Sequence, residues 1–275
     1  MKNGKFVKTL ALVMALCLLV AGFAGCGAGN SKKTLVMGTN AEFPPFEYYT
    51  EDGLIDTFDG IDIAIAKEIG AQLDANISID NMPFESLLIA LAQDKIDFVA
   101  AGMTVKPERL ENADFSISYY TATQVIIAKE GTAIASAADL TGKAVGVVLG
   151  YTGDVIVTAL EGVTVERYKK GTDAVMDLVN GKVDAVVIDA APAASFVEKN
   201  AGLTIIKDAA AFENEEYAIA VKKGNTELLG QINGVLEELL ANGSIAEFGA
   251  KYAVAEEAAP ADDQPEANPD EQPAE

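Results

Sequence analysis

The chain has 275 residues, and 42 acidic side chains against 20 basic ones give it a net charge of −22 at pH 7. This excess of negative charge argues against a nucleic-acid partner, and against attachment to anionic lipids through a basic patch. The sequence has no histidine, which removes the commonest general base and the commonest metal ligand, so we expect neither a metal nor another cofactor.

The N-terminus carries the pattern of an export signal. Lysines precede an apolar run at residues 10–23, which is too short for a comfortable membrane span. Small residues then lead into Cys26, as in the bacterial lipoprotein signal, in which that cysteine receives a lipid. We expect residues 1–25 to be removed, residues 26–33 to act as a tether, and the lipid on Cys26 to hold the exported protein at the outer face of the membrane. The alternative is a plain secretory peptide with an incidental cysteine.

The folded part alternates β-rich runs with helical periodicity over about residues 34–253, which is typical of α/β sheets. Its first half is expected to contain strands at residues 35–39, 77–81 and 97–101, two extended runs within residues 115–129, and helices at residues 59–73 and 84–92. In the first of these helices Ile61, Ile65, Ile69 and Leu73 share one face.

The most informative stretch follows the expected strand at residues 97–101. Gly102 allows close backbone access in a turn, Thr104 adds a hydroxyl, and Pro107 suits the first turn of a helix. A guanidinium can grip a carboxylate through two parallel hydrogen bonds, so Arg109 predicts a carboxylate-binding site at this turn. The alternative is an arginine in a surface salt bridge after an ordinary β-to-α turn.

A second set of strands and helices follows the same pattern. Strands are expected at residues 143–149, 164–168, 183–189, 204–207 and 217–221, and helices at residues 154–160, 172–180, 192–200 and 226–252, the last split at residues 242–244. Two α/β sets with glycine turns at their strand ends suggest two lobes that face each other across a ligand cleft. Residues 253–275 are rich in Ala, Pro, Glu and Asp, and we expect them to form a disordered acidic tail.

Several short motifs occur in a fixed order through the folded part. They are residues 38–48 (GTNAEFPPFEY), 58–64 (FDGIDIA), 84–88 (FESLL), 101–109 (AGMTVKPER), 114–116 (DFS), 150–153 (GYTG) and 184–189 (DAVVID). Together with the lipoprotein signal, this ordered set resembles the extracellular solute-binding proteins of family 3, the polar amino-acid group that serves ABC importers. The resemblance covers about residues 34–252.

The resemblance implies an α/β fold of the type II periplasmic-binding-protein kind, with two α/β lobes joined by two hinge strands. Lobe 1 would be discontinuous, with residues 34–125 and 216–252, and lobe 2 would hold residues 126–215. The hinges would lie near residues 123–125 and 212–217. The protein would be a monomeric receptor, not an enzyme. By cleft closure it would deliver a polar or charged L-amino acid to an ABC permease on a separate chain.

The resemblance also implies roles for individual residues. Arg109 would pair with the ligand α-carboxylate beside Thr104 and Gly102. Thr152 would add a hydroxyl and helix N-terminal amides to the same carboxylate. Asp189 would bind the ligand α-ammonium, with capping of the following helix as the alternative role.

The side-chain pocket implied by the resemblance has aromatic and polar members. Phe43 and Phe84 would sandwich the ligand side chain, with ordinary core packing as the alternative. A carboxylate such as Glu42 would suit a cationic ligand, whereas Asn40 would suit a neutral amide. Tyr151 stands where the family frequently has threonine or serine, so the resemblance leaves the identity of the ligand open.

Two other functions stay open at this point. Some relatives on the same fold dehydrate cyclohexadienyl or arogenate-type acids, which requires a tuned proton donor in the cleft. Without histidine, only a Glu, Asp, Lys or Tyr could donate that proton. The same cleft would also suit a sensory module that presents its bound ligand to a membrane receptor.

Overall fold

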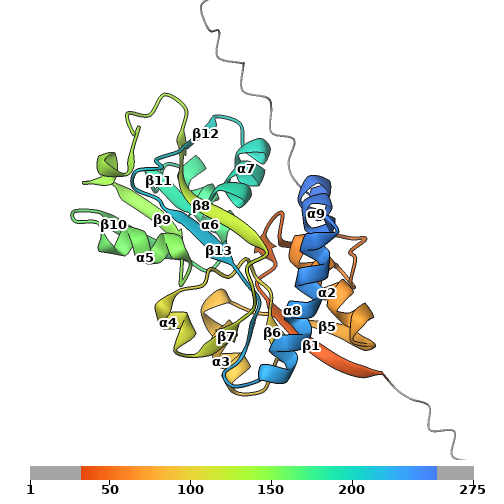
Figure 1. Ribbon diagram of the computed structural model, residues 1–275. Helices are drawn as coiled ribbons and strands as arrows, with labels where there is room; N and C mark the ends of the chain where they lie inside the picture. The colour runs from red at the N-terminus through yellow and green to blue at the C-terminus, as the bar shows by residue number, and fades with distance from the viewer. Residues whose placement is uncertain (1–31, 253–275) are drawn as a thin grey trace, which may run out of the picture. The chain divides into compact units, whose positions relative to one another are not determined.

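The computed structural model describes residues 32–252, and Figure 1 shows how the helices and strands follow one another. The expected signal peptide, Cys26, most of the tether and the acidic tail lie outside the described residues. None of the helices within residues 32–252 has both the length and the apolar character needed to cross a bilayer. Strands and helices alternate, as the sequence pattern predicts.

The first sheet has five strands in the order β5-β1-β6-β14-β7. These strands are β5 (Ala75–Asn81), β1 (Lys33–Thr39), β6 (Phe98–Val99), β14 (Ala220–Lys222) and β7 (Ala113–Phe115). Because β1 and β6 are parallel, their carboxyl ends meet at one edge of the sheet. The chain leaves β6 at this edge and enters the turn that contains Gly102.

Besides the short helix that follows β6, four helices accompany the first sheet (Figure 1). They are α2 (Ile61–Gln72), α3 (Leu87–Ala92), α8 (Thr226–Ala241) and α9 (Ser244–Tyr252). Ile61, Ile65 and Ile69 of α2 are buried as predicted, whereas Leu73, the fourth member of the predicted face, is half-buried at the C-cap. The last helical region is split as predicted, because Gly243 adopts a φ of 84° between α8 and α9.

The second sheet is built from the middle of the chain, in the order β10-β9-β11-β8-β12. Its strands are β10 (Thr164–Tyr168), β9 (Ala144–Val148), β11 (Ala185–Asp189), β8 (Tyr120–Lys129) and β12 (Leu203–Ile206). Its helices are α5 (Thr152–Ala159), α6 (Gly171–Val179) and α7 (Ala190–Lys199). Because β9 and β11 are parallel, α5 and α7 begin at the same edge of the sheet.

Strand β8 takes part in two sets of pairings. From Gln124 onward it pairs with β11 and β12, whereas its earlier residues pair with β13 (Asn214–Tyr217). The start of β8 and β13 therefore run antiparallel side by side (Figure 1). Along the chain β8 follows β7, and β13 precedes β14, so this pair carries both connections between the two sheets.

The predicted single strand at residues 217–221 is wrong, because the structure has two strands there, β13 and β14. Between them the backbone turns to other partners. The Ala218 N–H donates to the Met103 carbonyl at 3.1 Å, and the Ile219 N–H donates to the Ser116 hydroxyl at 2.9 Å. A change of partner inside an apolar run leaves no mark in the hydrophobic pattern.

A small three-stranded sheet has no counterpart among the predicted elements. It consists of β2 (Glu42–Phe43), β3 (Glu47–Tyr49) and β4 (Phe58–Asp59). Strands of two or three residues are too short for an alternating pattern to be recognised. The helix predicted at residues 84–92 also differs in detail, because it starts with a 3-10 turn, Phe84–Ser86, before α3.

Candidate functional site

Residues from segments around both sheets line a small cavity of about 10 Å³, which we call the site cavity. Its lining residues are Phe43, Phe84, Ala101, Gly102, Thr104, Arg109, Tyr151, Thr152 and Asp189. In this conformation such a volume has room for about one water molecule. The structure thus brings together all the predicted ligand residues except Asn40 and Glu42.

Gly102 shapes the turn that enters the site cavity. Its φ of 51° lies in the left-handed region, and a Cβ here would stand 2.5 Å from the Phe43 ring. The Gly102 N–H donates to the Asp62 carboxylate at 2.8 Å, and the Tyr119 hydroxyl donates to the same group at 2.8 Å. Glycine therefore lets the backbone pass close to an aromatic ring while a buried carboxylate holds the turn.

Arg109 reaches the site cavity from a short helix, α4 (Pro107–Leu110), which begins at the predicted proline. The residue is only 8% exposed, and burial lowers its pKa against the opposing effect of nearby carboxylates, Asp189 first. Nη1 donates to the Thr104 carbonyl at 2.7 Å, and Nη2 donates to the Gly150 carbonyl at 3.0 Å. A buried guanidinium held by neutral carbonyls differs from the surface salt bridge considered above, and its charge suits an anion.

Asp189 ends β11 and occupies the N-cap position of α7, but its side chain makes no capping hydrogen bond. Its carboxylate instead accepts a hydrogen bond of 2.6 Å from the Tyr217 hydroxyl. Asp189 is 4% exposed, and burial, with the Glu215 charge, raises its pKa to about 6. Tyr217 therefore orients this side chain, which does not bond to the helix backbone as the capping alternative requires.

Two hydroxyls meet between the sheets. Thr152 begins α5, and its hydroxyl donates to the Thr104 hydroxyl at 3.2 Å. Thr104 donates in turn to the Glu215 carboxylate at 2.8 Å. A hydroxyl has one proton and two lone pairs, and Thr152 occupies one of these lone pairs. Thr104 therefore offers one lone pair to the cavity and suits a cationic group better than a carboxylate. This polarity differs from the role that the resemblance implies for its side chain.

Aromatic rings form one side of the site cavity. Tyr151 meets Phe43 and Phe84 edge to face, with ring centroids 5.2 and 4.6 Å apart. The Arg109 guanidinium lies 5.1 Å from the centroid of the Phe84 ring. The Tyr151 hydroxyl donates to Asn40 Oδ1 at 2.8 Å, so Asn40 contacts Tyr151, which lines the cavity, but does not line the cavity itself. Both phenylalanines are buried, which fits a ligand contact and core packing alike.

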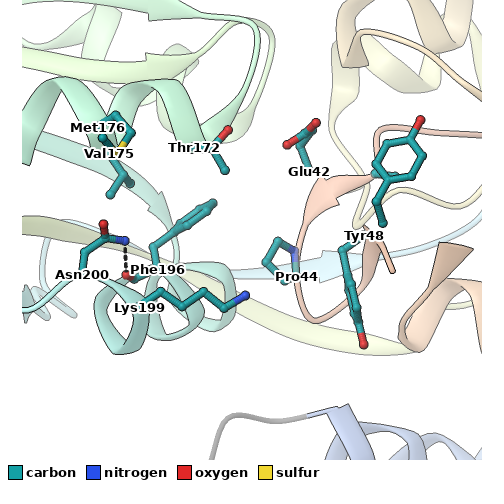
Figure 2. A pocket seen from close by; sticks show the side chains of 11 residues that line it. Glu42, Pro44, Tyr48, Thr172, Val175, Met176, Phe196, Lys199 and Asn200 are labelled. Atoms are coloured by element: carbon teal, nitrogen blue, oxygen red, sulfur yellow. Dashed lines mark hydrogen bonds between the residues drawn. The ribbon is translucent and has the colours of Figure 1, made fainter. Parts of the chain in front are cut away.

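Glu42 lies elsewhere. Successive side chains of a strand point to opposite faces, so Glu42 in β2 points away from the side of Phe43. It lines a second cavity of about 360 Å³, shown in Figure 2, together with residues of α6 and α7 such as Phe196. Its carboxylate lies 2.6 Å from Lys170 Nζ. The structure therefore does not bring Glu42 into the site cavity.

A buried carboxyl pair beside the Gly102 turn was not predicted. Burial and the neighbouring Asp62 raise the pKa of Glu47, which is fully buried, well above its usual range. Burial raises the pKa of Asp62 to about 6, against the opposing effect of hydrogen bonds from Gly102 and Tyr119. Within the described residues neither carboxyl oxygen of Glu47 has a hydrogen-bond partner, and a carboxyl buried in this way favours its neutral form. The available signal was an acidic residue inside each of two apolar motifs, PPFEY and DGIDIA.

Two residues of β13 were also missed. Tyr217 and Glu215 bond to Asp189 and Thr104, which lie 28 and 111 positions away along the chain. Local patterns carry no information on partners so distant. A signal was nevertheless present, because two polar-tipped residues two positions apart in a strand share one face.

The chain is similar to known bacterial binding proteins. A family model described as bacterial extracellular solute-binding proteins, family 3, matches residues 35–255. The arginine-binding extracellular protein ArtP of Bacillus subtilis is 35% identical over 259 residues, which span 90% of this chain and 99% of that protein. An L-arginine-binding protein of Pseudomonas aeruginosa is 34% identical, over 90% of this chain and 96% of its own. The solved structure of an ancestral arginine-binding protein bound to arginine is 40% identical with a TM-score of 0.76, and the match covers 81% and 99% of the two chains.

Proposed function

The chain belongs to the bacterial extracellular solute-binding proteins of family 3, and we propose that it is an amino-acid receptor whose ligand is a cationic L-amino acid, L-arginine. The fold is that of the type II periplasmic amino-acid-binding proteins. Its relatives serve ABC transporters as extracellular amino-acid-binding proteins, and amino-acid binding for such a transporter is the function of this chain. The proposal concerns which amino acid is bound, by which residues, and how.

One observation carries the proposal: Arg109 and Asp189 carry opposite charges, are both buried, and line the same cavity. A zwitterion pairs with both side chains, with its α-carboxylate on Arg109 and its α-ammonium on Asp189. The first N–H groups of α5 add donors for the carboxylate, and the Thr152 hydroxyl adds another when it turns from Thr104 to the ligand. Thr104, which presents a lone pair, adds an acceptor for the ammonium. A phosphate fits less well, because Asp189 would repel its second negative charge.

The surroundings of Tyr151 favour a cationic side chain on the ligand. Burial raises the pKa of Tyr151, and the negative charges of Asp189, Glu42 and Glu85 add to this effect. The potential at this end of the site cavity is therefore negative, which attracts a guanidinium or ammonium group. The names of the relatives that bind arginine agree with this reading.

We propose cleft closure as the way in which binding is detected. Thr104 and Arg109 follow β6 of the first sheet, whereas Thr152 follows β9 and Asp189 ends β11 of the second. A zwitterion held at both ends bridges the two sheets, so it favours their approach. The lobes would comprise residues 34–125 and 216–252, and residues 126–215, with β8 and β13 as the hinge strands.

The closed form would dock as a monomer on a permease that is a separate chain. A lipid on Cys26, followed by the tether, would keep the exported receptor at the outer face of the membrane. We propose that the protein releases its ligand unchanged. Mass spectrometry of the protein purified from membranes would test the lipid, because an acylated Cys26 at the new N-terminus has a diagnostic mass.

Calorimetry with a panel of the common L-amino acids tests the proposed ligand. L-Arginine is expected to bind tightest, with L-lysine next and neutral amino acids weaker. D-Arginine places the ammonium and carboxylate on exchanged sides and should lose most of the affinity. Binding of a neutral or acidic amino acid in preference to arginine would refute the choice of ligand. Absence of binding by every amino acid would refute the roles given to the site residues.

A further inference from the structure

Alternate residues of β13 have different surroundings. Glu215 and Tyr217 share one face of the strand, and both bond to residues of the site cavity. Glu216 lies between them on the other face, where its carboxylate accepts hydrogen bonds from the hydroxyls of Ser118 and Thr121. The same strand therefore presents two residues that act on the site and one that does not.

The backbone of β13 also holds the turn that carries Thr104. Thr104 and Tyr217 form an isolated antiparallel bridge, and the Val105 N–H donates to the Glu216 carbonyl at 2.9 Å. The Thr104 hydroxyl is thus held beside β13, where its 2.8 Å bond to Glu215 decides which way its proton points. With the proton on that side, the oxygen faces the cavity as an acceptor.

Tyr217 delivers its hydroxyl from a fixed ring. The residue is fully buried, and its ring lies 5.2 Å from that of Phe46 and 5.5 Å from that of Tyr120. The hydroxyl donates to Asp189 Oδ1 at 2.6 Å. A carboxylate accepts about four hydrogen bonds, so lone pairs of Asp189 remain for a cation beside this bond and the nearby Gln124 amide.

We propose that Glu215 and Tyr217 are positioning residues for the ammonium half of the ligand. Glu215 keeps Thr104 turned as an acceptor, and Tyr217 keeps the Asp189 carboxylate turned toward the cavity. The inference rests on the proposed function, because it requires a ligand with an α-ammonium group. It goes further in placing the support for that group on β13, one of the two connections between the sheets.

Three probes separate the two ends of the ligand. They are L-arginine, 5-guanidinopentanoic acid, which lacks the α-ammonium, and agmatine, which lacks the α-carboxylate. Calorimetry on the purified protein compares Tyr217→Phe and Glu215→Ala with the wild type. Each substitution should lower the affinity for L-arginine and agmatine by about tenfold and keep the affinity for 5-guanidinopentanoic acid within about twofold. The reason is that each substitution disturbs a charge-assisted contact to the ammonium alone.

Two matched controls remove comparable groups elsewhere. Glu216→Ala removes a carboxylate from the other face of β13, and Tyr252→Phe removes the tyrosine hydroxyl that donates to Asp59. Both should keep the affinity for L-arginine within about twofold of the wild type. Equal losses of L-arginine and 5-guanidinopentanoic acid in Tyr217→Phe and Glu215→Ala would overturn the inference, because a purely structural role weakens both probes. If L-arginine is not the ligand, the wild-type protein already fails to bind it, so this outcome is distinguishable from failure of the inference about Glu215 and Tyr217.

A second measurement needs no ligand. Titration of the Asp189 carboxyl carbon by NMR should show its pKa raised by Tyr217→Phe, which removes a donor to the carboxylate, and lowered by Glu215→Ala, which removes a like charge. The other charged and titratable neighbours of Asp189 are retained in both variants; they are Arg109, Lys106, Glu47 and Tyr151. An Asp189 titration that is unchanged in both variants would contradict the inference.

Discussion

Replacing Arg109 by lysine keeps the positive charge at the site but removes the planar set of donors. In the structure Nη1 and Nη2 each serve one carbonyl, that of Thr104 at 2.7 Å and that of Gly150 at 3.0 Å. The remaining N–H groups are available for two bonds to a carboxylate. A lysine nitrogen cannot serve both carbonyls and a bidentate carboxylate. Loss of one charge-assisted bond costs about 1.5–3 kcal/mol and loss of one carbonyl contact about 1 kcal/mol, so L-arginine should bind about 100-fold more weakly.

Calorimetry at physiological salt measures this loss, and a thermal melt of each variant shows whether the fold is kept. Arg167→Lys is the matched control. Arg167 pairs with Asp154 at 2.8 Å and its side chain is 40% exposed, so this substitution should leave the affinity within about twofold. If Arg109→Lys binds L-arginine within threefold of the wild type while Arg167→Lys does the same, the guanidinium does not hold the carboxylate and the reasoning fails.

Three further predictions concern pH, backbone strain and the second cavity. Asp189 and Asp62 have pKa values raised to about 6 from 3.8, so they take up protons in the folded state first. The free energy of unfolding of the ligand-free protein should therefore rise as pH falls from 7 to 4, while the affinity for L-arginine falls. Denaturation measures the first quantity and calorimetry the second across this range. A stability and an affinity that change in the same direction would contradict the roles given to these two carboxyls. Gly102→Ala should lower Tm by about 6–12 °C, because φ strain and overpacking together cost about 3 kcal/mol, whereas Gly131→Ala, with open space around it, should cost only about 1 kcal/mol. Glu42→Gln should change the affinity for L-arginine by less than about threefold, because Glu42 pairs with Lys170 outside the site cavity. A larger loss in calorimetry would show that Glu42 contributes to ligand binding.

The two charged residues of the site, Arg109 and Asp189, could be predicted from the sequence. Arg109 follows a predicted strand, a glycine turn and a proline, and Asp189 ends an apolar run that reads as a buried strand. Both lie at the carboxyl ends of strands, where open α/β sheets bind their ligands. Strand ends are visible in local patterns, and so the two opposite charges could be assigned to one cleft before their distance was known.

The finer features of the site depend on distant partners, which local patterns do not contain. The face on which Glu42 lies is set by β2, a strand of two residues that has no readable alternation. The polarity of Thr104 depends on Glu215, 111 positions away. The division of residues 217–221 into β13 and β14 depends on Met103 and Ser116, which draw the backbone between the strands to new partners.

The contacts across the site cavity have a consequence for how selective such a receptor can be. The Tyr151 hydroxyl donates to Asn40 and the Thr152 hydroxyl to Thr104, so two hydroxyls that line the site cavity are already engaged within the protein. A ligand that uses these hydroxyls has to break the hydrogen bonds that they make within the protein. The measured affinity is therefore the free energy of the contacts that the ligand forms, less that of the internal hydrogen bonds that are lost. A molecule that pairs with only one of Arg109 and Asp189 should therefore bind more weakly than one that pairs with both. Selectivity is then enforced by competition within the protein as well as by the shape of the pocket.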